Sequence, residues 1–358
     1  MKLIELHILQ SFPVSCLNRD DVGAPKSAKF GGVPRARLSS QCLKRAIREY
    51  ADSQGLTTAK FTGKRTKRLA AWIAEELQGK HSLNAERALA MGCAIAGALN
   101  KKDGKALDPK DPEMEALFYA SPMQVTELAK IAMKEWGTSK KIEGGKEAFR
   151  KKCEEIGVYD AADIALFGRM VAADPSLTLE GAAMFSHALS THKVSNDLDF
   201  FSAMDERRDR NDPGAAHIDN NQFNAAVYYR YAAVNLDLLF GNEKHLGKLT
   251  TPERKGVISA FIEATVMAVP GARKNSMNAS VPPSYVLGIY KDAGQPVQLI
   301  NAFESAVPGT GLVEASRKAL EAHHAALKTT WGITTVEEVT VPDAPLLTLI
   351  EKLTSHVS

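Results

Sequence analysis

The sequence has no uninterrupted run of about 18 to 20 apolar residues, the length that a membrane-spanning helix needs. The first residues also lack the pattern of a secretory signal, because Glu5 and His7 interrupt the apolar positions there. We therefore expect a soluble cytoplasmic protein with no membrane partner.

Cysteine is scarce too, with four residues in a chain of 358 and no CxxC pair among them. No two of these cysteines lie near a histidine pair at zinc-ligand spacing. We expect free thiols, and neither a metal nor another cofactor. The four residues are Cys16, Cys42, Cys93 and Cys153.

The motifs of several large enzyme classes are missing as well, namely GxSxG, the P-loop and a GxGxxG after a strand. His187 and His192 are five residues apart and His323 and His324 are adjacent, so neither pair has metal-ligand spacing on one helix face. There is no internal repeat and no low-complexity tract. These absences predict a protein that is not an enzyme.

What the chain does have is one concentrated basic segment, between Arg19 and Arg48. Of the 45 basic and 42 acidic residues of the chain, eight and two lie here, which leaves 37 basic and 40 acidic residues elsewhere. A local charge of +6 in an otherwise balanced chain predicts a surface that binds a polyanion. The charged residues of the segment are Arg19, Asp20, Asp21, Lys26, Lys29, Arg35, Arg37, Lys44, Arg45 and Arg48.

The second half of this segment has the pattern of an amphipathic helix. Ser39 or Ser40 follows a loop rich in glycine and proline and is a good cap for a helix that runs to about Tyr50. The buried stripe would hold Leu43, Ala46, Ile47 and Tyr50. The opposite face would hold Gln41, Lys44, Arg45 and Arg48. With the positive helix N-terminus, this face suits backbone phosphates, although a solvated basic face is the alternative.

These same residues carry a resemblance to a known family. The chain from His7 to Arg48 resembles the opening of the CasC family, the guide-RNA-binding backbone subunit of the type I-E CRISPR surveillance complex, Cascade. The matching positions are Leu17-Asn18-Arg19-Asp20-Asp21, Pro25-Lys26, Phe30-Gly31-Gly32, Arg37-Leu38-Ser39-Ser40-Gln41 and Leu43-Lys44-Arg45.

The resemblance resumes at Asp163–Met170, where Met170 occupies the position of an apolar contact to the guide, although a core position is equally open for this residue. Residues 270–274 resemble a family segment whose basic residues also reach the RNA. The resemblance and the basic face together predict these RNA-binding residues: Arg19, Lys26, Lys29, Ser39, Gln41, Lys44, Arg45, Arg48, Met170, Phe200, Phe201, Arg273 and Lys274.

Phe200 and Phe201 precede a long polar stretch, residues 205–214, which ends at a β-branched and aromatic strand, residues 226–231. This pattern predicts a protruding hairpin-like loop. By resemblance it is the family's thumb, at about 194–224, which lies across the guide and displaces a base at regular intervals. The alternative is that the two phenylalanines anchor a loop to the core.

The periodicity predicts a strand at 2–10 and helices at about 69–76, 88–99, 125–136, 252–269, 316–329 and 345–354. The resemblance implies an α+β fold with an RRM-like (ferredoxin-like) palm. Residues 1–59 would be the first part of the palm, 60–160 a helical fingers insertion, and 161–358 the remainder of the palm with the thumb.

The implied function is to bind guide RNA through its backbone, as one of several helically stacked copies beside other Cascade subunits. The complex would recognise complementary foreign DNA through guide pairing in antiviral defence. The alternative is a metal-dependent ribonuclease subunit that cuts guide-paired RNA through Asp20 and Asp21. We favour a turn cap or a salt bridge with Arg19 or Lys26 for these carboxylates.

Overall fold

The structure is a computed structural model, which describes residues 1–56, 60–100, 103–137, 146–172, 174–203, 217–242, 244–271 and 273–358. The chain divides into two compact units. The first unit holds residues 1–50, 185–233 and 261–356, and the second holds residues 51–184, 234–260 and 357–358. Within the described ranges, no helix is long and apolar enough to cross a membrane.

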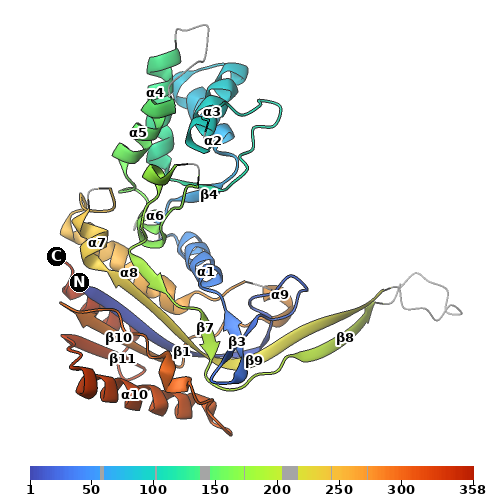
Figure 1. Ribbon diagram of the computed structural model, residues 1–358, viewed down its shortest axis with the longest axis vertical. Coiled ribbons are helices and arrows are strands. Elements are labelled where there is room, and N and C mark those ends of the chain that lie inside the picture. Colours follow the sequence, from blue (N-terminus) through green and yellow to red (C-terminus); the bar gives the residue numbers. More distant parts are fainter. Residues whose placement is uncertain are drawn as a thin grey trace, which may run out of the picture. The chain divides into compact units, whose positions relative to one another are not determined.

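The first unit is built on a sheet whose strands follow the order β11-β10-β1-β9-β7-β3-β2, with β6 and β8 also pairing with β9 (Figure 1). Every strand pair with a described register is antiparallel, so the predicted α+β class is confirmed. The strands are β1 (Leu3–Ser15), β2 (Ser27–Phe30), β3 (Val33–Leu38), β6 (Ala183–Phe185), β7 (Ala188–Ser190), β8 (Asp197–Ala203), β9 (His217–Asn235), β10 (Tyr285–Lys291) and β11 (Glu337–Val341).

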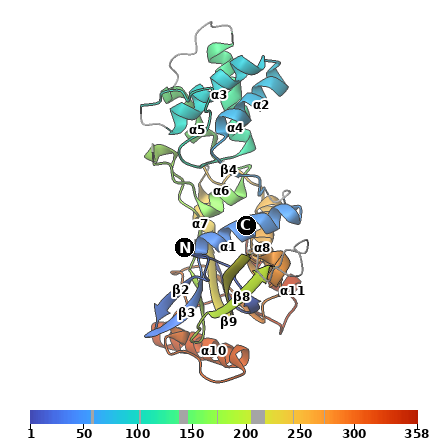
Figure 2. The ribbon, with the colours of Figure 1, turned by 90° about the vertical axis from the view of Figure 1, so that its right-hand side faces the viewer.

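Helices pack on this sheet from two sides. Figures 1 and 2 show α10 on one side of the sheet and the start of α1 on the other. The helices predicted at 252–269, 316–329 and 345–354 are all present. The helices of this unit are α1 (Ser40–Ser53), α9 (Lys274–Met277), α10 (Leu312–Trp331) and α11 (Leu346–Ser355), with a short 3-10 helix at Ile300–Phe303. The helix α8 (Thr251–Met267) begins in residues of the second unit and ends in residues of the first.

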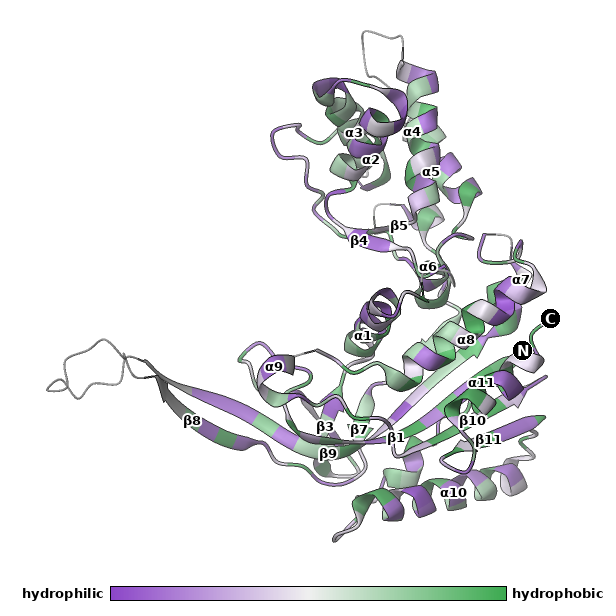
Figure 3. Ribbon diagram, turned by 180° about the vertical axis from the view of Figure 1, so that it is seen from behind, coloured by the Kyte–Doolittle hydropathy of each residue, from purple (hydrophilic) through white to green (hydrophobic). Residues whose placement is uncertain are grey.

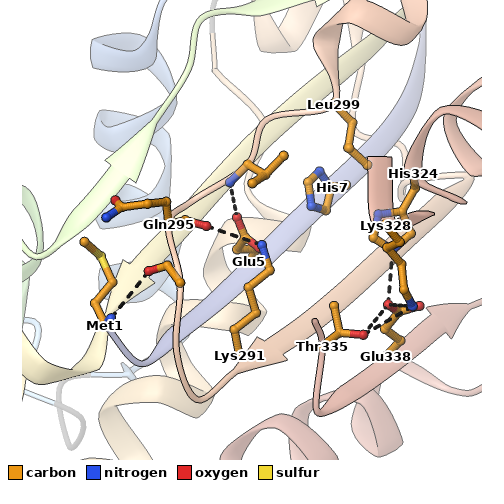
Figure 4. Close-up of polar contacts among 12 residues, drawn as sticks. Met1, Glu5, His7, Lys291, Gln295, Leu299, His324, Lys328, Thr335 and Glu338 are labelled. Carbon is orange, nitrogen blue, oxygen red and sulfur yellow. Dashed lines mark hydrogen bonds and ion pairs between the residues drawn. The ribbon is translucent and has the colours of Figure 1, made fainter. Parts of the chain in front are cut away.

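The predicted N-terminal strand is present, but both of its faces are buried. Glu5 and His7, the polar residues of the alternating pattern, are 0% and 1% exposed. The Glu5 carboxylate forms an ion pair of 2.5 Å with the ammonium of Lys291 (Figure 4). It also accepts a 2.8 Å hydrogen bond from the Tyr231 hydroxyl. Burial lowers the pKa of His7 to about 3, so this imidazole is neutral. Polar partners on neighbouring strands therefore satisfy the inward-facing groups of β1.

The second unit includes the helical stretch 60–160, and α2 to α5 share one apolar core. The helices predicted there begin and end close to their predicted residues. Ser121 begins α4 with a capping box, in which its hydroxyl accepts from the Gln124 amide N–H. The elements are β4 (Lys64–Thr66), α2 (Leu69–His81), α3 (Ala85–Asn100), β5 (Phe118–Ala120), α4 (Pro122–Trp136), α5 (Lys146–Ile156), α6 (Ala162–Phe167), the 3-10 helix Pro175–Leu177 and α7 (Leu236–Gly241).

Strands β8 and β9 form the predicted hairpin. Their register runs from Asp197 opposite Phe223 to Ala203 opposite His217. The base of the hairpin is tied to the basic loop, because the Asn196 amide donates to the Pro25 carbonyl at 3.4 Å. The predicted polar stretch, residues 205–214, lies outside the described residues.

Candidate nucleic-acid interface

The basic loop leads into α1 through a cap that the sequence predicts. The Ser39 hydroxyl accepts a 3.3 Å hydrogen bond from the Cys42 amide, so Ser39 rather than Ser40 is the capping residue. The backbone N–H of Ser39 donates to the Asn18 side chain at 2.8 Å, which fastens the helix start to the loop. Leu43 and Ile47 are buried as predicted, and the helix continues to Ser53. Because Ser39 is buried and used in the cap, it positions α1.

The basic face of α1 is present, and one of its cations forms an ion pair. Gln41 and Arg45 are exposed, whereas Lys44 and Arg48 are half-buried. The Lys44 ammonium lies 5.5 Å from the centre of the Phe185 ring. Arg45 forms a 2.7 Å ion pair with Glu49, one turn further along the helix. Glu49 lies one residue beyond the segment that sequence reasoning counted, so its compensating charge was missed.

Arg35 is one of the eight cations of the segment, and it is not on the surface. Its side chain is 0% exposed, and its guanidinium donates to the backbone carbonyls of Phe30, Ser190, Phe303 and Glu304 at 2.8 to 3.2 Å. Burial lowers the pKa of Arg35, and the Glu304 carboxylate partly offsets this effect. Arg35 therefore holds the fold together and does not meet a ligand, which corrects its inclusion in the surface charge.

A cavity of about 730 Å³ opens between the basic loop and α1. Two arginines and three carboxylates line it, so its charge is mixed rather than uniformly positive. The lining residues are Leu17, Asn18, Arg19, Asp20, Asp21, Gly23, Cys42, Arg45, Ala46, Glu49, Pro270 and Gly271.

Asp20 has a structural role in this loop. Its carboxylate accepts hydrogen bonds from the backbone N–H groups of Val22 at 3.1 Å and Ala24 at 2.9 Å. The turn-cap interpretation of this residue is therefore confirmed. Across the described ranges there is no group of three histidine, cysteine or carboxylate side chains that could hold a metal ion.

The pKa shifts of two thiols show which of the predicted cations lie close together. All four cysteines are free. Burial raises the pKa of Cys16, and the nearby charges of Arg273 and Arg19 oppose this rise. Burial likewise raises the pKa of Cys42, opposed by Arg45 and Lys26. The structure thus brings cations of the loop, of α1 and of the start of α9 to one region of the first unit, as the sequence predicts.

The remaining predicted basic residues lie at the edges of this region. Lys29 is exposed on β2, and Lys26 is half-buried where the loop enters that strand. Arg273 has a left-handed backbone (φ 52°) and lines a depression of about 500 Å³ with Gly271. Lys274 begins α9, but its side chain lies outside the described part of the structure.

Phe200 lies in β8 and its side chain is 69% exposed, so it does not anchor the hairpin to a core. Phe201 follows it in the same strand. The side chain of Phe201 lies outside the described part. The neighbour of Phe200 on its own face is Leu198, 60% exposed, which sequence reasoning missed although strand alternation predicts it.

Met170 belongs to the second unit and is 81% exposed, so it is not a core residue. Its neighbour Arg169 is buried, and its guanidinium donates to the Tyr119 and Leu177 carbonyls and to the Gln124 side chain at 3.0 to 3.1 Å. The segment thus fixes a short connection while leaving the Met170 side chain in solvent.

The fold has clear counterparts among solved structures. One chain of a "CRISPR RNA-guided surveillance complex, pre-nicking" aligns with a TM-score of 0.82 and 28% identity, over 99% of this chain and 100% of its own. A chain of another "CRISPR RNA-guided surveillance complex" aligns with a TM-score of 0.72 and 25% identity, over 99% of each chain. No curated protein matches the sequence. These matches confirm the resemblance to the CasC family, and because the family model matches residues 4–353, the chain belongs to the CT1975-like protein family.

Proposed function

We propose that this protein binds CRISPR guide RNA as a subunit of an RNA-guided surveillance complex. One observation carries the proposal. The basic loop and the basic face of α1 lie together in a chain that aligns over 99% of its length with a surveillance-complex chain.

The contacts would be to the RNA backbone. One protein must accept guides of every spacer sequence, so cations that meet phosphates suit this task better than groups that read base edges. The phosphate contacts would come from Arg19, Lys26, Lys29, Gln41, Lys44, Arg45, Arg48, Arg273 and Lys274, and the capping hydroxyl of Ser39 holds the helix that presents four of them.

The hairpin would act as a thumb on an RRM-like (ferredoxin-like) palm. Phe200 and Leu198 share one face of β8, where an exposed apolar pair suits the unstacking of a base. We assign the wedge to Phe200, because its exposed side chain shares this face with Leu198. Met170 would make a second apolar contact from the second unit. Several copies would stack along the guide beside the other Cascade subunits of a type I-E complex. One displaced nucleotide per copy would leave the intervening bases free to pair with foreign DNA.

We propose binding without chemistry for this subunit. An Asp20–Asp21 metal site would need an unengaged carboxylate pair, but the Asp20 carboxylate holds two backbone N–H groups of its own turn. The ribonuclease alternative therefore has no observation in its favour.

The test is to purify the full chain from its host and to sequence the RNA that copurifies. Repeat-derived small RNAs with mixed spacers are the expected result. Absence of RNA from protein that is folded by circular dichroism, or RNA of one unrelated class, would contradict the proposal.

A further inference from the structure

The second unit carries a basic run of its own around β4. Residues 53–74 contain five basic residues and no carboxylate. Lys60 forms a 3.2 Å ion pair with Glu253. The other four are exposed: Lys64, Arg65, Lys67 and Arg68. Figure 3 shows β4 as a hydrophilic strand. This run shares no residue with the surface proposed for the guide.

Within β4, the consecutive residues Lys64 and Arg65 point to opposite faces of the strand. Lys64 and Arg68 line a groove of about 250 Å³ with Thr66, and the first turns of α2 complete it with Ala71, Trp72 and Glu75. Arg65 points elsewhere, with its guanidinium 4.7 Å from the centre of the Tyr119 ring. The groove thus has a cation from each side of Thr66, and one aromatic ring.

These cations are weakly compensated. Lys64 lies 3.7 Å from Asp52, but both side chains are more than half exposed, and such surface pairs contribute little. Within the described ranges no carboxylate pairs with Lys67 or Arg68. Glu75 lines the groove and is the acid that any ligand there would meet. The groove therefore has a net positive charge, to which an anion can bind.

Trp72 narrows the choice of anion. Its ring packs on the helical core and is only partly buried, so its remaining surface belongs to the groove. Clustered cations beside an aromatic ring are how proteins hold single-stranded nucleic acid, because phosphates meet the cations and any base can stack on the ring. An acidic protein segment would use the cations but not the indole face.

We propose that the β4 groove is a second polyanion site, which binds a stretch of single-stranded nucleic acid through Lys64, Arg68 and Trp72, with Lys67 adding long-range attraction. It is distinct from the guide surface, and it would hold a strand that the guide does not occupy.

The test titrates the full chain, as purified with any bound RNA, with a fluorescein-labelled oligothymidylate of about 20 nucleotides, and with the matching oligouridylate. Lys64→Ala with Arg68→Ala should lower the slope of log K against log salt by about 1.4, because each phosphate contact in single strands contributes about 0.7. The matched control removes two exposed lysines of the same unit, Lys105→Ala with Lys151→Ala, and should keep the slope. Binding of either oligonucleotide supports the site, and the preference identifies the sugar of its natural strand.

Trp72→Leu should weaken binding about fivefold or more, since stacking of a base is worth about 1–3 kcal/mol. Trp72→Phe, which keeps a ring, should restore most of that loss. An unchanged salt slope in the double variant, or competition by polyglutamate as strong as by oligothymidylate, would overturn the proposal.

Copurified RNA separates this proposal from the guide-binding function. The double variant should keep its guide RNA while losing oligothymidylate. Loss of both would place β4 in the guide surface and refute a second site. A wild-type protein without guide RNA would refute the guide-binding function, and the oligothymidylate titration would still decide the β4 groove.

Discussion

Two stretches of the chain are rich in cations, residues 19–48 in the first unit and residues 60–68 in the second. They differ in how much of their positive charge is exposed to solvent. In the first, Arg35 is fully buried and Arg45 is paired with Glu49. In the second, the four basic residues between positions 64 and 68 are all exposed. A count of charges in the sequence therefore overestimates the first surface. Burial and pairing decide how much charge a ligand meets.

The largest expected effect separates the buried cation from the exposed ones. Arg35→Met should lower the free energy of unfolding by about 3 kcal/mol or more, because it leaves several buried carbonyls without a donor. Arg45→Met, at a side chain that is 74% exposed, should cost less than about 1 kcal/mol. Urea unfolding of the two variants measures this difference. Equal losses would show that Arg35 is not a structural cation.

The next effect concerns the exposed aromatic side chain on the β8–β9 hairpin of the first unit. Phe200→Ala should weaken guide RNA binding by about 1–3 kcal/mol, the worth of one stacked base, and leave thermal unfolding unchanged. Trp331→Ala removes another exposed aromatic ring, in α10, and serves as the control. A lower unfolding temperature for Phe200→Ala, together with normal RNA binding, would show that Phe200 is a core residue.

The smallest effect concerns the ion pair on α1. Glu49→Gln should tighten guide RNA binding by about 0.3–1 kcal/mol, because it releases Arg45 and removes a carboxylate from the cavity. Glu314→Gln breaks an exposed helix pair with Lys318 elsewhere in the first unit and should not change binding. Weaker binding after Glu49→Gln would mean that the pair positions Arg45 for the RNA.

Much of the interface could be predicted because its signals are local. The serine cap follows from the type of residue that precedes the helical pattern. Helix periodicity then predicts the buried stripe of Leu43 and Ile47 and the basic face of α1. The burial of Arg35 could not be predicted, because its acceptors at 190, 303 and 304 are more than 150 residues away in the sequence.

Other misses also have physical causes. The helix α5 escaped prediction because its core stripe is reduced to Phe149 and Cys153 in a strongly charged segment. Glu5 and His7 look like the exposed positions of an alternating strand, and only distant partners such as Lys291 explain their burial. The sequence was interpreted as placing Phe200 with its adjacent residue Phe201. Strand alternation instead predicts that Phe200 shares a face with Leu198.

The central claim is that the basic face of α1 binds the guide backbone whatever its sequence. The most direct measurement is the salt dependence of affinity for two guides with unrelated spacers, for wild type and for Lys44→Ala with Arg48→Ala. We predict equal slopes for the two guides, and a fall of about 1.4 in both slopes for the double variant. A slope that stays at the wild-type value, or a loss confined to one spacer, would contradict the claim.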